Sequence, residues 1–118
     1  MRYAVLTILA VLIGATDPRV TQSNIGTTIC QPGYSRTVRP PVSWSGRVKR
    51  QMLHGLPARS YELDHVIPIE VGGAPMDPRN LQIQPWPAAR AKDKLEGQVH
   101  RAVCAGRMTL EQGQAVFR

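Results

Sequence analysis

Four polar residues in the middle of the chain have side chains suited to binding a metal ion and activating a water molecule. Asp64 directly precedes His65, Asn80 follows fifteen residues after the histidine, and Asp93 comes early in a helical stretch. Carboxylate and amide oxygens bind hard divalent cations, and a neutral imidazole accepts a proton near neutral pH. If the four side chains converge, the sequence predicts a hydrolytic metal site.

Two short strands are expected to position these residues. Residues 61–69 are rich in apolar side chains and predict a strand, and residues 81–84 alternate apolar and polar, which predicts a second one. Between them the pair Gly72-Gly73 allows positive φ and a sharp reversal of the chain. Successive side chains of a strand point to opposite faces. A bend or bulge is therefore needed for Asp64 and His65 to reach one site.

Helices are expected on both sides of the strand pair. The pattern predicts a helix over 46–54 and a long helix over 88–105 that Gly106 ends. Thr109 and Gln112 predict a capping box for a last helix to about residue 117. Residues 35–42 contain a Pro-Pro pair and are predicted to be extended.

The long helix has two stripes that other elements should cover. The first is apolar and should pack on the strand pair: Ala91, Leu95, Val99 and Ala102. The second lies on nearly the opposite face: Asp93, His100 and Cys104. If Cys104 pairs with Cys30, the N-terminal arm crosses this second face.

The chain of 118 residues is one domain at most, with three segments. Residues 1–15 combine a positive start with an apolar run too short to span a membrane, which predicts a signal peptide. An uncleaved anchor, a lipid-facing helix and a buried N-terminal helix are the alternatives. Residues 16–29 are polar and predict a flexible lead-in, and residues 30–118 form the predicted domain. Export to the periplasm or medium would let Cys30 and Cys104 form a disulfide, whereas in the cytosol two free thiols are expected.

The net charge of +7 suits a polyanionic partner such as nucleic acid. Basic residues in the first half of the domain and at the start of the long helix are candidates for phosphate contacts: Arg36, Arg39, Lys49, Arg50 and Arg90. The alternative for each of them is a solvated surface charge.

Taken in order, these motifs resemble those of the HNH nucleases. The resemblance rests on the run Leu63–Pro68, on Gly72-Gly73, on Asn80-Leu81 and on Lys92-Asp93. More narrowly, the run Lys92–Glu96 is similar to the helix start of small exported bacterial and phage HNH-like proteins. The similarity extends from about residue 30 to residue 106.

The resemblance implies an α+β fold with a small ββα-metal domain, flanking helices and a signal peptide. It implies a metal-dependent endonuclease of low sequence specificity, with His65 as general base and Asp64 as metal ligand. Asn80 is the second expected catalytic residue, which holds the turn and orients His65. The family usually has a third ligand near Ala89, where this chain has none, and Asp93, one turn further on, is the expected replacement. Mg²⁺ is the expected ion, with Mn²⁺, Ni²⁺ and Zn²⁺ as alternatives, and DNA is the favoured partner.

Other interpretations of the same residues stay open at this point. Asn80 alone would suit a turn, His65 a half-buried strand, and Asp93 the positive end of the helix dipole. The whole chain would then be a nucleic-acid-binding module that has lost catalysis, or a structural exported protein. No membrane span is expected once the leader is removed, and the sequence does not indicate an oligomeric state.

Overall fold

Two antiparallel strands, β1 (Tyr61–His65) and β2 (Leu81–Pro85), form the centre of the computed structural model, which describes residues 14–118. Their register places Tyr61 opposite Pro85 and His65 opposite Leu81. Both predicted strands are therefore present, but the first ends at His65 and not at residue 69. The chain bends at residues 66–67, and after Pro68 it forms the 3₁₀ helix η3 (Ile69–Val71).

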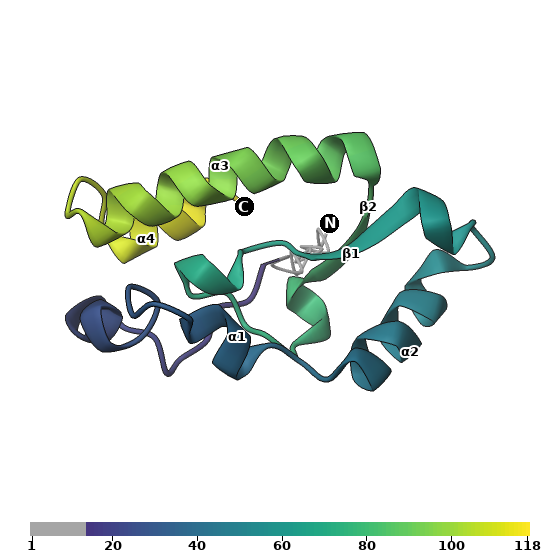
Figure 1. Ribbon diagram of the computed structural model, residues 1–118, viewed down its shortest axis with the longest axis horizontal. Helices are drawn as coiled ribbons and strands as arrows, with labels where there is room; N and C mark the ends of the chain where they lie inside the picture. The colour runs from purple at the N-terminus through teal and green to yellow at the C-terminus, as the bar shows by residue number, and fades with distance from the viewer. Residues whose placement is uncertain (1–13) are drawn as a thin grey trace, which may run out of the picture.

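The helix α3 (Trp86–Cys104) follows β2 without a loop and lies along one side of the strand pair (Figure 1). A proline in the first turn of α3 is tolerated, because the backbone N–H groups of a first turn have no hydrogen-bond partner within the helix. The last helix, α4 (Leu110–Ala115), folds back beside the C-terminal half of α3 (Figure 1). Its N-cap is Thr109, whose hydroxyl accepts a hydrogen bond from the backbone of Gln112.

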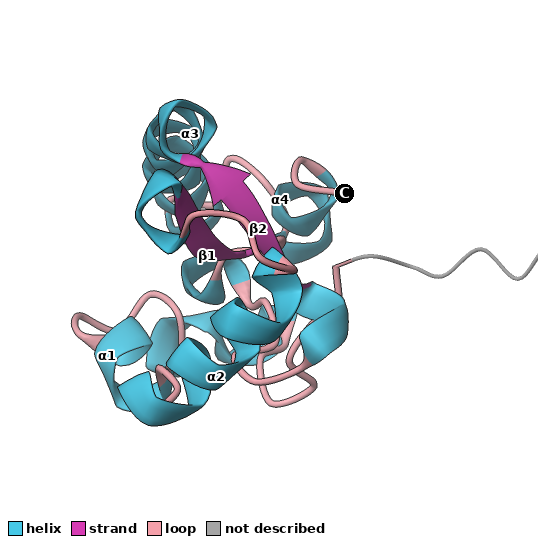
Figure 2. Cartoon of the chain, turned by 90° about the vertical axis from the view of Figure 1, so that its right-hand side faces the viewer, coloured by secondary structure: helices cyan, strands magenta, loops and turns pink. Residues whose placement is uncertain are grey.

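Two further helices, α1 (Tyr34–Val38) and α2 (Val42–Leu53), lie on the other side of the strands from α3 (Figures 1 and 2). The expectation that residues 35–42 are extended was wrong, because a proline restricts only the residue directly before it. Arg39 is extended, with ψ of 137°, but the four residues before it are helical. The helix predicted over 46–54 is α2, and it begins four residues earlier.

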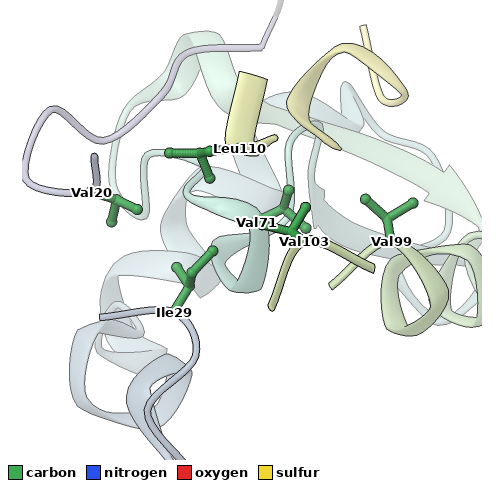
Figure 3. Close-up of a cluster of buried hydrophobic side chains, with 6 residues drawn as sticks. All are labelled: Val20, Ile29, Val71, Val99, Val103 and Leu110. Atoms are coloured by element: carbon green, nitrogen blue, oxygen red, sulfur yellow. The ribbon is translucent and has the colours of Figure 1, made fainter. Parts of the chain in front are cut away.

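The remaining regular structure consists of short 3₁₀ helices: η1 (Gln22–Thr27), η2 (Ala58–Ser60) and η4 (Pro78–Asn80). Residues 16–29, expected to be a flexible lead-in, contribute Val20 and Ile29 to the core. Figure 3 shows these two side chains together with Val71 of η3 and with three residues of the C-terminal helices: Val99, Val103 and Leu110. The core therefore joins segments from both ends of the described chain.

The apolar stripe predicted for α3 was right at Val99, which is in the core, and wrong at Leu95. The buried residues of α3 are Ala89, Val99 and Val103, whereas Leu95 is 39% exposed. The side of α3 that faces the strands carries the charged residues Lys92 and Glu96. The helix therefore packs on β1 partly through ion pairs, which a search for apolar periodicity does not detect.

The predicted disulfide is confirmed, with 2.07 Å between the sulfurs of Cys30 and Cys104. As expected, the N-terminal arm crosses the second stripe of α3, where the imidazole of His100 lies 2.8 Å from the carbonyl oxygen of Ile29. The predicted leader falls almost wholly on residues 1–13, outside the described part of the chain. Among residues 14–118, no helix combines the length and the apolar character that crossing a membrane requires.

Candidate active site

The connection from β1 to β2, residues 66–80, is fastened from inside by the side chain of Asn80. This side chain is fully buried. Its Oδ1 accepts a hydrogen bond from the backbone N–H of Ile67 at 2.9 Å, and its Nδ2 donates to the carbonyls of Ile67 at 2.9 Å and Ala74 at 3.0 Å. The backbone carbonyl of Asn80 also accepts from Val66 at 2.8 Å. One amide thus ties both ends of the connection together.

The glycine pair allows the chain to approach itself closely at this point. Gly72 has φ of +83°, as the sequence predicted, and follows η3 directly. At Gly73 an added Cβ would lie 1.8 Å from the carbonyl oxygen of Ile67 and 2.9 Å from Nδ2 of Asn80. Only a residue without a side chain fits there, so Gly73 is required for the hydrogen bonds of Asn80.

His65 is held in one orientation by this connection. Its Nε2 lies 2.8 Å from the carbonyl oxygen of Pro75. A carbonyl only accepts hydrogen bonds, so Nε2 carries the proton and the lone pair is on Nδ1. Burial lowers the pKa of the His65 imidazole below its ordinary value of 6.5, against the opposite effect of the Pro75 carbonyl. The ring is therefore neutral at neutral pH, with Nδ1 ready to accept a proton.

Two hydrogen bonds and one peptide bond connect Asn80 to this imidazole. Nδ2 of Asn80 holds the carbonyl of Ala74, and the next residue, Pro75, supplies the carbonyl that accepts from His65. Asn80 therefore fixes the group that orients the imidazole, without touching the imidazole itself.

His65 lines a cavity of about 150 Å³ between β1, α1, η3 and α3. Five of the eight acidic residues of this basic chain line the same cavity: Glu62, Asp64, Glu70, Asp93 and Glu96. Arg39 and Ser35, at α1, complete its polar wall. Negative charge is thus concentrated at one place, beside a neutral imidazole, in a molecule of net charge +7.

The carboxylates of the cavity are close enough to perturb one another. Burial is the main reason that the pKa of Glu96 is raised to about 7; the ammonium of Lys92 opposes the rise, and the charges of Asp64 and Glu70 add to it. Burial, together with the charges of Asp64 and Asp93, also raises the pKa of Glu62. Unfavourable burial and mutual repulsion are the conditions under which a bound cation is stabilising.

Lys92 of α3 holds two of these carboxylates. Its ammonium lies 2.5 Å from Oδ2 of Asp64 and 3.2 Å from Oε1 of Glu96, and it also donates to the carbonyl of His65. The ring of Phe117 lies 5.6 Å from the same ammonium. Lys92 is absent from the lining of the cavity, so it contacts Asp64 and Glu96 from behind. The second oxygen of each carboxylate, Oδ1 and Oε2, receives no hydrogen bond from Lys92.

Within residues 14–118, no three His, Cys, Asp or Glu side chains are already gathered around one point as metal ligands. The donors along the cavity nevertheless suit a hard divalent ion, because they are carboxylate oxygens with one imidazole. One of these oxygens, Oε2 of Glu62, is buried and has no hydrogen-bond partner in the described part of the chain. An oxygen in that state is costly unless a cation or a proton binds it. The residues therefore fit Mg²⁺ or Mn²⁺ by chemistry, although their side chains are not preassembled around it.

The structure brings three of the four predicted site residues to the cavity. Asp64, His65 and Asp93 line it, whereas Asn80 lies in the connection behind His65. Ala89, at the position where a third ligand was sought, is 1% exposed and turned into the core. Of the five basic residues predicted to contact phosphate, Arg39 lines the cavity, and four others among the described residues do not: Arg36, Lys49, Arg50 and Arg90.

Sequence reasoning did not assign roles to Glu62, Lys92 and Glu96. The signal for Glu62 was its position two residues before Asp64, which puts both carboxylates on the same face of β1. The signal for the other two was their i, i+4 spacing, which places an ammonium and a carboxylate side by side on one helix face.

Comparisons of the chain with models of protein families, with curated proteins and with solved structures found no match. The function of the site is therefore inferred from its own residues.

Proposed function

We propose that the chain is a metal-dependent endonuclease of the HNH type, which hydrolyses phosphodiester bonds with His65 as the general base. The observation that carries the proposal is the neutral, oriented imidazole of His65 in a cavity lined by five carboxylates. The order of β1, β2 and α3 along the chain supports it, because this is the order of a ββα-metal motif.

His65 has the position and the protonation state that water activation needs. Nδ1 accepts a proton from a water molecule, and the water oxygen forms a bond to the phosphorus as the bond from phosphorus to the leaving oxygen breaks. The leaving oxygen then takes up a proton from solvent. The Pro75 carbonyl stabilises the resulting imidazolium, because it accepts a hydrogen bond from Nε2. Arg39 lines the same cavity, and its guanidinium would contact the phosphate.

The carboxylates would hold the divalent ion. Asp64 offers Oδ1, Glu62 offers its buried Oε2, and Asp93 and Glu96 of α3 complete the oxygen-rich wall. When bound, the ion would supply positive charge to offset the charge of the phosphate and of the leaving oxygen. DNA is the favoured substrate, with low sequence specificity. The disulfide supports an oxidising location, and therefore export.

Nicking of supercoiled plasmid in the presence of Mg²⁺ or Mn²⁺, with EDTA as the control, tests this proposal. We expect nicking that requires the metal, and we expect Asp64→Asn to raise the metal concentration needed for half-maximal rate, because a charged donor is lost. Cutting that continues in excess EDTA, or an Asp64→Asn protein with unchanged metal dependence, would contradict the metal site.

One observation favours a second candidate, a nucleic-acid-binding module of the same fold that does not cut. The ammonium of Lys92 already pairs with Asp64, the first predicted ligand. If Lys92 is the permanent cation of the cavity, no divalent ion is needed for stability. Binding of DNA without nicking at any concentration of either metal would support this candidate.

A further inference from the structure

The same tripeptide turn occurs twice on the surface of the molecule, as Asp17-Pro18-Arg19 and as Asp77-Pro78-Arg79. In each turn the backbone N–H of the arginine donates to Oδ1 of the aspartate at 2.9 Å. In each turn the guanidinium also binds the carboxylate through Nε and Nη2, with the Nη2 hydrogen bond at 2.8 Å in the first turn and 2.6 Å in the second. The two arginines are therefore held in the same way at two places far apart in the sequence.

Each turn presents its positive charge to solvent and its negative charge to the protein. The side chains of Arg19 and Arg79 are 68% and 70% exposed, whereas those of Asp17 and Asp77 are 4% and 25% exposed. A guanidinium oriented by a carboxylate still has free N–H groups on Nη1 and Nη2, and it loses little side-chain entropy when it binds an anion. The turns therefore have the properties of anion-binding groups.

Both turns line one groove, of about 750 Å³, with Thr37 and Val38 of α1 and with residues 74–76. The backbone holds the turns in place, because Asp17 N–H donates to the carbonyl of Gly72 and Gly14 N–H donates to that of Arg79, each at 2.9 Å. The spacing of the two arginines is thus fixed by the fold.

The groove adjoins the cavity at two points. Pro75 lines the groove, and its carbonyl accepts the hydrogen bond from His65, which lines the cavity. Val38 lines the groove, and the next residue, Arg39, lines the cavity. A cavity of about 150 Å³ has no room for a whole nucleotide, so a nucleic-acid strand with one phosphate at His65 must continue over a neighbouring surface.

We propose that this groove binds the nucleic-acid strand beside the scissile bond, with Arg19 and Arg79 each contacting one backbone phosphate. The assignment rests on the proposed function for the identity of the strand. Contacts to phosphates carry no information about base sequence, so the groove positions the substrate without selecting it. Exposed Met76 and the prolines of both turns give the sugars an apolar surface between the two charges.

The salt dependence of DNA binding tests the groove. Affinity for duplex DNA of mixed sequence would be measured in EDTA over a series of salt concentrations, for the parent and for the double variant Arg19→Gln/Arg79→Gln. Each lost phosphate contact should reduce the slope of log K against log salt by about 0.9. We expect a reduction of about 1.8 in the double variant, and a slope close to that of the parent in Arg107→Gln, which removes an exposed arginine that lines neither the groove nor the cavity.

A double variant Arg19→Lys/Arg79→Lys distinguishes the effect of lost positive charge on DNA binding from the effect of lost stability. It keeps the two positive charges and should keep most of the slope, even where loss of the paired guanidinium lowers the melting temperature. The proposal for the groove would be contradicted by equal slopes in the parent and the glutamine variant, or by a parent that binds DNA too weakly to measure. It would also be contradicted if Arg107→Gln reduced the slope as much as the double variant does. The nicking assay is independent of this result. If the protein nicks DNA but the slope does not change, only the proposal for the groove is contradicted. If the slope changes but the protein does not nick DNA, only the proposed hydrolytic function is contradicted.

Discussion

His65 combines a low proton affinity with a fixed tautomer, and both have the same structural cause. Burial beside the 66–80 connection lowers its pKa, and the Pro75 carbonyl in that connection determines which nitrogen is protonated. A general base must be unprotonated at the working pH. We therefore expect the acidic limb of the pH profile of kcat/KM for plasmid nicking, at saturating Mg²⁺, to have its midpoint below pH 6.5. A midpoint above pH 7 would show that another group is the base.

Glu96 gives a separate prediction, which concerns stability. Its folded-state pKa of about 7 lies above its ordinary value of 4.5, mainly because of burial. Between these two values the folded protein keeps a proton that the unfolded chain has released, so the free energy of unfolding falls as pH rises through this window. The full loss is on the order of 3 kcal/mol.

Urea unfolding at about pH 5 and about pH 8, without metal, measures this loss. Glu96→Gln cannot release a proton and should show a smaller fall between the two pH values than the parent. Mg²⁺ should restore more stability to the parent at the higher pH than at the lower one, since only the ionised carboxylate binds it. If the parent and Glu96→Gln have the same pH dependence, the carboxyl does not titrate in this window.

At the scale of elements, the connection between β1 and β2 positions the site more than either strand does. Within this connection Gly73 tolerates a side chain least, because a Cβ there would lie 1.8 Å from the carbonyl oxygen of Ile67. Gly73→Ala should lower the free energy of unfolding by about 3 kcal/mol or more, since backbone atoms would have to move. Thermal or urea unfolding measures the loss.

Gly26→Ala is a matched control for this change. Gly26 lies in η1, and no atom is within 4 Å of an added Cβ. Its substitution should change stability by less than about 1 kcal/mol. Similar losses in the two variants would mean that the close approach at Gly73 does not hold the connection together.

The elements also show which parts of the fold the sequence predicts and which it does not. The two strands, the long helix and the last helix were predicted because their signals are local: strand alternation, Gly106 and the Thr109 capping box. The helix α1 was missed because the Pro-Pro pair was expected to keep residues 35–38 extended, whereas a proline restricts only the residue directly before it.

The candidate site was predicted in part, for a comparable reason. Adjacent residues such as Asp64 and His65 attract attention as a motif, and both line the cavity. The ammonium of Lys92, 28 residues from Asp64, reaches it through the packing of α3 on β1. The apolar pattern of α3 gives no sign that Lys92 faces β1, so the ion pair could not be anticipated. The pairing of His65 with Pro75 likewise depends on a connection whose path the sequence does not specify.

At the scale of the whole molecule, one disulfide fastens the N-terminal arm to α3. Cys30 and Cys104 are 74 residues apart, and closing a loop of that length restricts the unfolded chain by about 4 kcal/mol in the chain-entropy model. We expect reduction, or the double variant Cys30→Ser/Cys104→Ser, to lower the free energy of unfolding by this order, measured by urea titration. A protein of unchanged stability after reduction would show that the arm is held by the apolar core alone.

The distribution of charge also belongs to the whole molecule. Five carboxylates line one cavity, while the net charge of the chain is +7. Such an arrangement attracts a polyanion to the surface and a cation to the cavity. The basic surface and the acidic cavity are separate regions of the molecule, and Arg39 is a basic residue that lines the cavity.

The central claim is that the His65 imidazole removes a proton from water at this cavity. The measurement that tests it most directly is the rate of plasmid nicking by His65→Ala at saturating Mg²⁺, compared with the parent. His54→Asn is the control, because His54 is an exposed histidine with φ of 47°, a conformation that asparagine tolerates. We predict that His65→Ala loses about 10²-fold to 10⁴-fold in rate while its DNA affinity in EDTA is retained, and that His54→Asn cuts like the parent. Equal rates for His65→Ala and the parent would contradict the account.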